Sequence, residues 1–211
     1  MKKELETALF DKYPSLFRER EKTLMRWGIT CGDGWYRLVD LLSEQIVNRS
    51  TDIQACQVKE KLGELRFYLK HTNEENCYFI YGLTSMASLL SIAICDKCGL
   101  KGNRYYDLYI CTRCEKHRPR KRQKEQWLAA ELPFKTNGIG AMWLNIINMF
   151  YLRIDANPHI YTDLTFVEAR KVDGKLVLVL ENGDDSTNAM LLMLHAYANL
   201  VDEETGEWND A

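Results

Sequence analysis

Four cysteines in two CxxC pairs carry the clearest chemistry in this sequence. Cys95 and Cys98 form the first pair and, after a spacer of 12 residues, Cys111 and Cys114 form the second. A CxxC turn directs two sulfurs to one side of a tight loop, and two such loops can complete the tetrahedron of thiolates that Zn²⁺ prefers. Gly99 follows the first pair, where a positive φ is often needed. Since four protein ligands leave no position for water, the motif predicts a structural zinc ion in a zinc ribbon.

Three other interpretations of the cysteine pairs stay open. Iron also occupies tetrahedral sites made of four cysteines. The pairs could instead be redox-active dithiols, although one CxxC at a helix N-terminus is enough for that chemistry. His117 follows Cys114 by three residues and is a possible substitute ligand, but the four cysteines already fill the site.

A run of basic residues follows the second pair. Positions 116–124 hold six Lys and Arg and no acid. Such a cluster could contact phosphates, so the candidate nucleic-acid-binding residues are Arg118, Arg120, Lys121, Arg122 and Lys124. We favour the alternative that the run is a solvated linker or faces the acidic part of the chain. The whole chain is acidic, and no aromatic residues are interleaved with these charges.

The other cysteines and histidines predict no catalytic site. Cys31, Cys56 and Cys77 stand alone, and isolated cysteines are usually small buried hydrophobes. His195 is isolated too and is expected to be a packed or surface residue. The sequence contains no phosphate-binding glycine loop, no HExxH and no GxSxG. We therefore expect a protein that is not an enzyme.

Charge divides the chain into two unequal parts. The net charge is −2, yet residues 125–211 hold five Lys and Arg against fourteen Asp and Glu, so they carry −9 and residues 1–124 carry +7. Hydrophobic residues make up 46% of the chain, which is enough for a core. No stretch of about 18 or more apolar residues occurs, and the N-terminus lacks the apolar segment of a secretory signal. We expect a cytoplasmic protein with no membrane span.

The elements that must position the cysteines are predicted from hydrophobic spacing. A helix is expected to begin near Asp33, whose side chain would accept hydrogen bonds from the first free N–H groups. Alternating apolar residues in the segment 58–70 predict a hairpin with a turn or bulge at Gly63. A second helical stripe over 79–94 leads directly into Cys95.

The second half predicts a smaller unit around one hairpin. Two strands within 165–181 flank Asp173 and Gly174, a two-residue turn that matches the twist of paired strands. The second strand contains LVLVL (176–180), which is apolar on both faces, so we expect it in the centre of a small sheet. An apolar helix near 139–150 precedes the hairpin, and a helix over 186–201 follows it.

Together these elements predict an α+β fold in two units that can share a core. Residues 1–118 form a helix–hairpin–helix unit with the zinc ribbon at 95–114. Residues 119–211 form an acidic α+β unit.

Three sequence blocks also indicate a relationship. CGDGWYRLVDLLSEQI, QVKEKLGELRFY and GLTSMASLLS with the two CxxC segments occur in this order over about residues 16–117. This combination resembles a family of small proteins encoded by tailed bacteriophages and prophages. The resemblance implies a bacterial host cell and no established activity, and it supports metal ligands only at Cys95, Cys98, Cys111 and Cys114. Residues 125–211 lie outside it.

These observations favour a non-enzymatic, phage-type protein that binds and modulates a host or phage macromolecule. We expect a protein partner ahead of nucleic acid, because the second half is acidic. Small acidic phage proteins can occupy the basic nucleic-acid-binding surfaces of host factors, so inhibition of a defence system is one form of this function. The alternative is a nucleic-acid-binding regulator that uses the zinc ribbon and the basic run 116–124.

Overall fold

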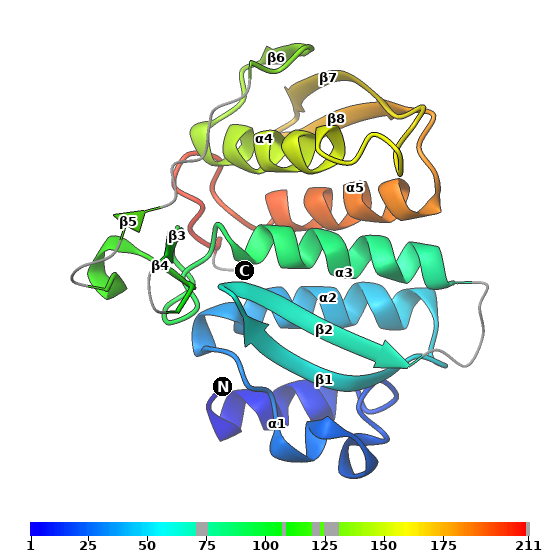
Figure 1. Cartoon of the computed structure of the whole chain (residues 1–211), viewed down its shortest axis with the longest axis vertical. Coiled ribbons are helices and arrows are strands. Elements are labelled where there is room, and N and C mark those ends of the chain that lie inside the picture. The colour runs from blue at the N-terminus through cyan, green and yellow to red at the C-terminus, as the bar shows by residue number, and fades with distance from the viewer. Residues whose placement is uncertain (71–75, 107–108, 120–122, 125–130, 210–211) are drawn as a thin grey trace.

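Amphipathic helices and short hairpins give this chain an α+β fold. The structure, a computed structural model, describes residues 1–70, 76–106, 109–119, 123–124 and 131–209. Figure 1 shows the main helices stacked in layers, with one hairpin near each end of the stack and the small sheet of β3, β4 and β5 at one side. The helices are α1 (Lys3–Lys12), α2 (Tyr36–Arg49), α3 (Cys77–Ser91), α4 (Ala141–Asp155) and α5 (Asp185–Ala198).

Strands in the described residues form three small sheets. The first pairs β1 with β2, the second has the order β4-β3-β5, and the third has the order β6-β7-β8. The strands are β1 (Gln54–Lys61), β2 (Glu64–Lys70), β3 (Asn103–Tyr106), β4 (Cys111–Arg113), β5 (Gln123–Lys124), β6 (Lys135–Asn137), β7 (Thr165–Val172) and β8 (Lys175–Glu181). Every pairing is antiparallel except that of β6 with β7.

Both predicted hairpins are confirmed, and both turn in the same way. Leu62 and Gly63 join β1 to β2, and Asp173 and Gly174 join β7 to β8. All four residues have positive φ, between 49° and 77°. Two consecutive positive φ angles give the turn whose twist matches that of the flanking strands.

The prediction that 176–180 lies in the centre of a sheet is wrong, because β8 is an edge strand. A helix, α5, covers its apolar residues instead. Leu176 and Leu178 are buried, and α5 packs against the strand. The N–H of Leu178 donates to Nε2 of His195 at 3.0 Å. A histidine on a helix thus takes the place that a further strand would have at this edge.

One hydrophobic cluster runs through both halves of the chain. It includes buried residues of α2 and α3 as well as those of α4, α5 and β8. α3 and α5 approach each other closely, because a Cβ on Gly82 would lie 2.0 Å from the backbone oxygen of Ser186. The division into units 1–118 and 119–211 stays a prediction, and the two share this core.

Asp33 has a different role from the one predicted. It begins a short 3-10 turn (Asp33–Trp35) before α2, and its Oδ1 accepts a hydrogen bond from the backbone N–H of Lys2 at 2.7 Å. The N–H of Gly34 donates instead to the carbonyl of Asp96 at 2.9 Å. The turn that precedes α2 is therefore bonded to another part of the backbone, and the N-cap residue of α2 makes no capping hydrogen bond with its side chain.

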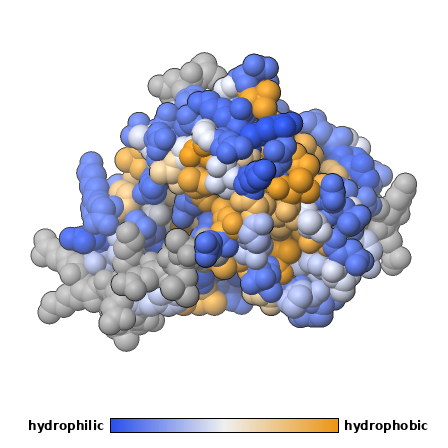
Figure 2. Space-filling view, turned by 90° about the horizontal axis from the view of Figure 1, so that it is seen from above, coloured by the Kyte–Doolittle hydropathy of each residue, from blue (hydrophilic) through white to orange (hydrophobic). Residues whose placement is uncertain are grey.

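The sheet at the top of Figure 1 presents a mixed surface. Seen from that side, apolar side chains are exposed between hydrophilic ones (Figure 2). Val167 and Val172 of β7 contribute to the exposed apolar residues of the molecule. None of the helices in the described part of the chain has the length and hydropathy needed to cross a membrane.

Candidate metal centre

The first CxxC pair lies in a tight loop directly after α3. The N–H of Cys95 donates to the carbonyl of Leu100 at 2.8 Å, and the N–H of Gly99 donates to the carbonyl of Cys95 at 2.9 Å. Gly99 has a φ of 79°, so the expected positive φ is confirmed. These bonds fix the loop so that Cys95 is buried and Cys98 is exposed.

The second pair lies at the end of a strand. Cys111 is in β4, opposite Tyr105 of β3, whereas Cys114 comes one residue after the strand. A 3-10 turn (Glu115–His117) follows, and the N–H of His117 donates to the carbonyl of Cys114 at 3.0 Å. With about three residues per turn, side chains three apart in such a turn lie above one another. The turn therefore brings the histidine beside the cysteine.

Four side chains converge to form a group that could hold a metal ion. Their ligand atoms, from Cys95, Cys98, Cys114 and His117, all lie within 4.8 Å of one another. Nδ1 of His117 is 3.3 Å from Sγ of Cys114 and 3.7 Å from Sγ of Cys95. The sulfurs of Cys98 and Cys114 are 3.7 Å apart. We call these four residues the metal group.

The metal group agrees with the sequence prediction at three positions. Cys95, Cys98 and Cys114 come together as expected, and the fourth member is His117. Cys111 is buried in β4 and is not a member of the group; its role as a ligand stays a prediction. The sequence signal for the histidine was the spacing of Cys114 and His117, which equals that of a CxxC pair.

The pKa values of two cysteines in the metal group are shifted in opposite directions. Desolvation, followed by hydrogen bonds with Cys95 and Cys114, raises the pKa of Cys98 to about 12. Burial also acts to raise the pKa of Cys114, but the N–H groups of His117 and Lys116 and the other two thiols hydrogen bond to its sulfur, so its pKa is lowered. The sulfur of Cys114 is thus the favoured acceptor of hydrogen bonds within the group. A cation that displaces the thiol protons would bind to all three sulfurs.

The CGDGW segment packs directly against the first cysteine loop. A Cβ on Gly34 would lie 2.2 Å from the carbonyl oxygen of Cys95, and one on Gly32 would lie 1.9 Å from that of Asp96. The buried indole of Trp35 donates to the carbonyl of Ile94 at 2.8 Å. Only glycine permits such an approach of two backbones. Two of the three sequence blocks therefore contact each other.

The remaining block, QVKEKLGELRFY, contacts the same region through the turn of the first hairpin. The hydroxyl of Thr112, in β4, donates to the carbonyl of Gly63 at 2.6 Å. Close by, the buried carboxylate of Glu64 pairs with Arg66 at 2.7 Å and with Arg104 at 3.1 Å. This buried charge network was not predicted. Alternation places Glu64 on the polar side of the strand, together with Arg66, so nothing in the sequence signals that its carboxylate is buried.

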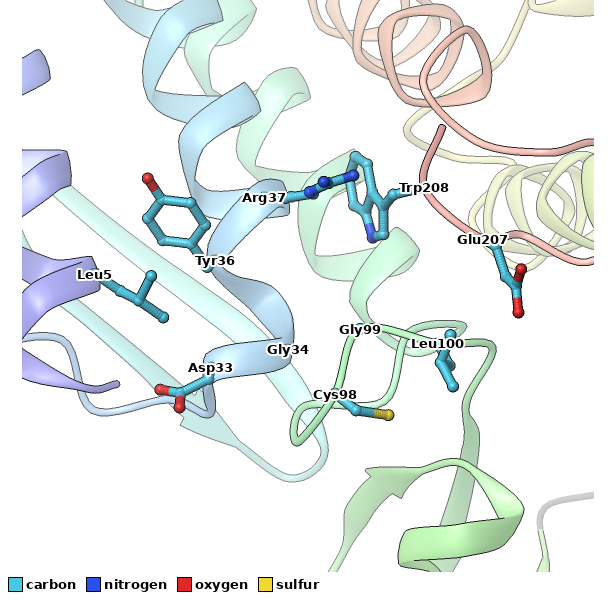
Figure 3. A pocket seen from close by; sticks show the side chains of 10 residues that line it. All are labelled: Leu5, Asp33, Gly34, Tyr36, Arg37, Cys98, Gly99, Leu100, Glu207 and Trp208. Carbon is cyan, nitrogen blue, oxygen red and sulfur yellow. The ribbon is translucent and has the colours of Figure 1, made fainter. Parts of the chain in front are cut away.

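A cavity of about 480 Å³ adjoins the exposed side of the first cysteine loop. Figure 3 shows Cys98 and Gly99 below Trp208 and Arg37, with the sulfur of Cys98 directed away from Asp33. Trp208 packs against Tyr197 with a ring separation of 5.3 Å, and it lies beneath Arg37 at 5.8 Å. The C-terminal segment thus lies beside the loop, where Nε1 of Trp208 would be 3.7 Å from a Cβ on Gly99.

The basic run is only partly described. Arg120, Lys121 and Arg122 lie outside the described residues, and of Lys124 only the backbone is described, in β5, opposite Tyr105. The guanidinium of Arg118 pairs with Glu115 at 3.1 Å on the surface.

The lone cysteines lie apart from the metal group. Burial raises the pKa of the Cys31 thiol to about 12, so it is protonated at neutral pH. Cys56 and Cys77 are half-buried. His195 accepts a hydrogen bond from Leu178 at the edge of β8, and His71 lies outside the described residues.

Comparison with family models, with curated proteins and with solved structures finds no match to this chain.

Proposed function

We propose that the metal group binds one structural zinc ion, in a zinc-ribbon-like site. A zinc ion lies about 2.3 Å from thiolate sulfur and about 2.05 Å from imidazole nitrogen, so a tetrahedral site separates two sulfurs by about 3.8 Å and a sulfur from a nitrogen by about 3.6 Å. The distances of 3.7, 3.3 and 3.7 Å in the metal group are close to these values. This agreement is the observation that carries the proposal.

The ion would join two segments that are separated in the sequence. Cys95 and Cys98 belong to the loop after α3, whereas Cys114 and His117 follow β4. Four protein ligands complete the coordination of zinc, so the role is structural, and we propose that the chain is not an enzyme. Zinc in such sites contributes directly to the free energy of folding.

The metal content of purified variants tests the proposed ligands. Wild-type protein should carry about one zinc per chain by elemental analysis, and Cys98→Ser and His117→Gln should lose most of it. Cys111→Ser is the matched variant, because it also changes a cysteine of a CxxC pair and lies outside the metal group. It should retain the ion. A Cys111→Ser protein without zinc, together with a His117→Gln protein that keeps it, would contradict this set of ligands.

For the biological role, we propose a phage-type protein that binds and modulates a host or phage protein. The net charge of −9 over residues 125–211 supports a partner with a basic surface, and the order of the three blocks in residues 16–117 supports the phage setting. Immunoprecipitation of the tagged, zinc-loaded chain from phage-infected bacteria should return one specific partner that carries a basic surface. Recovery of background proteins only would count against this role.

A regulator that binds nucleic acid through the run 116–124 is the second candidate. Arg118, the one residue of its proposed set whose side chain is described, already pairs with an acid. This observation favours the protein partner over this use of the run.

A further inference from the structure

A groove lies between the first hairpin and α3, away from the metal group. Its volume is about 290 Å³, and it reaches α4. The residues that line it and carry polar groups include Arg66 and Tyr68 of β2, Tyr81 and Ser85 of α3, and Arg153 of α4. No carboxylate of the described residues lines this groove, so its described charges are positive.

The register of the hairpin places two cations side by side next to this groove. Lys59 of β1 is directly opposite Arg66 of β2. The neighbouring pair, Val58 and Phe67, is buried, so Lys59 and Arg66 lie on the outer face of the hairpin. Like charges in opposed positions destabilise a pair of strands. A bound anion would remove this repulsion.

Among the residues that the structure describes, the acid that pairs with Arg66 is already shared. The carboxylate of Glu64 is buried and binds both Arg66 and Arg104. One negative charge therefore serves two guanidinium groups. Lys59 lies over the ring of Tyr68 at 5.4 Å and forms no ion pair with a described residue.

Arg153 supplies a further unneutralised cation from the other half of the chain. Its side chain is half-buried at the groove, and its guanidinium has no hydrogen bond or ion pair with any residue that the structure describes. Arginine presents a planar set of donors that suits phosphate oxygens. An arginine held in a groove without an acid is therefore a fitting phosphate ligand.

Exposed tyrosine rings alternate with these cations. Tyr68 is 42% exposed and Tyr81 is 60% exposed, although both are large aromatic residues. Tyr78 is 74% exposed and lies three positions before Tyr81, so it projects from the same side of α3. Exposed aromatic rings beside basic side chains are the arrangement on which unpaired bases stack while the phosphates are neutralised.

We propose that this surface, defined by Lys59, Arg66, Tyr68, Tyr81 and Arg153, binds single-stranded nucleic acid. Phosphates contact Lys59, Arg66 and Arg153, and unpaired bases stack on Tyr68 and Tyr81. A duplex, whose bases are already stacked on one another, binds more weakly. This site goes beyond the proposed protein partner and uses no residue of the run 116–124.

Fluorescence anisotropy with the zinc-loaded full chain tests the proposal. The probes are a labelled 12-nucleotide oligo(dT), an RNA of the same length, and a 12-base-pair DNA duplex, in low salt. The single strands should bind more tightly than the duplex. Tyr81→Ala should weaken binding roughly 5- to 150-fold, whereas Tyr81→Phe, which keeps a stacking ring, should retain it.

A pair of arginine variants distinguishes the groove from the basic run. Arg153→Gln should weaken oligo(dT) binding and reduce the slope of log affinity against log salt by about 0.7. Arg118→Gln, which removes the same charge from the surface, should leave binding unchanged. Zinc content and circular dichroism of each variant show whether it is folded, so a failure here is separate from a failure of the zinc proposal.

Three results would overturn the proposal. The first is no binding of either single strand in low salt. The second is loss of binding in Arg118→Gln with none in Arg153→Gln and Tyr81→Ala, which would assign nucleic acid to the basic run. The third is displacement of oligo(dT) by poly-glutamate at equal charge concentration, which would indicate an acidic protein segment as the occupant.

Discussion

α3 takes part in two regions of the molecule that are stabilised differently. Along its length it packs against α5, and at its C-terminal end it leads into the metal group. The contact with α5 is apolar and includes buried residues such as Leu83, Met86, Ala189 and Met193. The region of the metal group is held by backbone hydrogen bonds and by buried ion pairs such as Asp96 with Arg113. A close backbone approach at a glycine occurs in both regions.

This difference indicates which part of the molecule needs the metal. Burial of apolar surface stabilises the pair of helices without any ion. In the first cysteine loop Cys98 and Leu100 are exposed, and backbone hydrogen bonds are worth only about 1 kcal/mol each in water. We therefore expect metal to decide the structure of the cysteine loops and to have a small influence on the contact of α3 with α5.

Removal of the metal should give the largest difference in stability between the cysteine loops and the helices. A strong chelator should increase amide exchange in 94–106 and 109–117 by on the order of 100-fold or more, because the loops open locally. Amides in the middle of α3 and α5 should stay protected. Hydrogen exchange with mass spectrometry measures both regions at once, and excess zinc should restore the slow exchange. Equal loss of protection in both regions would remove the distinction.

The same substitution, glycine to alanine, can be made in each region and its effects compared. Gly34→Ala places a Cβ 2.2 Å from the carbonyl oxygen of Cys95, and Gly82→Ala places one 2.0 Å from that of Ser186. Each should lower the free energy of unfolding by about 3 kcal/mol or more, because backbone must move.

Only the first of these variants should also lose zinc. Gly138→Ala is the control, since its Cβ would meet no atom within 4 Å and its cost is limited to the positive φ of 61°, about 1–2 kcal/mol. Urea unfolding and elemental analysis give the two readouts. Retention of zinc by Gly34→Ala would show that the CGDGW segment does not shape the cysteine loop.

The sequence predicted those parts of the molecule whose signals are local. Both hairpins follow from alternation and from glycine at the second turn position, and the helices follow from their apolar spacing. The positive φ of Gly99 in the first cysteine loop was also predicted. Each of these features depends on residues within about ten positions of one another.

Features that depend on contacts between distant segments were not predictable in this way. LVLVL looked central because it is apolar on both faces, but α5 and His195 cover its free edge. The metal group contains His117 and not Cys111 because of where β4 ends. Cys111 lies within the strand, and Cys114 lies beyond it. Spacing alone cannot show that a 3-10 turn then carries the histidine back to the sulfurs.

His195 provides a smaller test, which concerns the second region alone. Burial lowers its pKa below the ordinary value of 6.5, and its Nε2 can accept from Leu178 only while unprotonated. The unfolded chain therefore takes up this proton at higher pH than the folded chain. The stabilisation is fully present above pH 6.5 and is lost as pH falls through that value toward the lower folded pKa.

The loss should be on the order of 1 kcal/mol between about pH 7.5 and 5.5. His195→Gln, whose amide oxygen can accept the same hydrogen bond, should show a flatter dependence on pH in urea unfolding. His159→Gln, at an exposed position, should behave like the wild type. A His195→Gln protein with the wild-type pH dependence would contradict the role of this histidine at the edge of β8.

The smallest effect is expected at the surface next to the metal group. Arg118→Ala removes an exposed ion pair with Glu115, and such pairs contribute about 0.5 kcal/mol or less. Its thermal midpoint and zinc content should match those of the wild type. A large loss of either would mean that the basic run takes part in building the site.

The most direct measurement is the zinc K-edge X-ray absorption spectrum of the wild-type protein in solution, because it counts the ligand atoms without any variant. The metal group predicts three sulfur neighbours at about 2.3 Å and one nitrogen neighbour at about 2.05 Å. A shell of four sulfurs and no nitrogen would contradict the assignment of His117 and return the fourth position to Cys111.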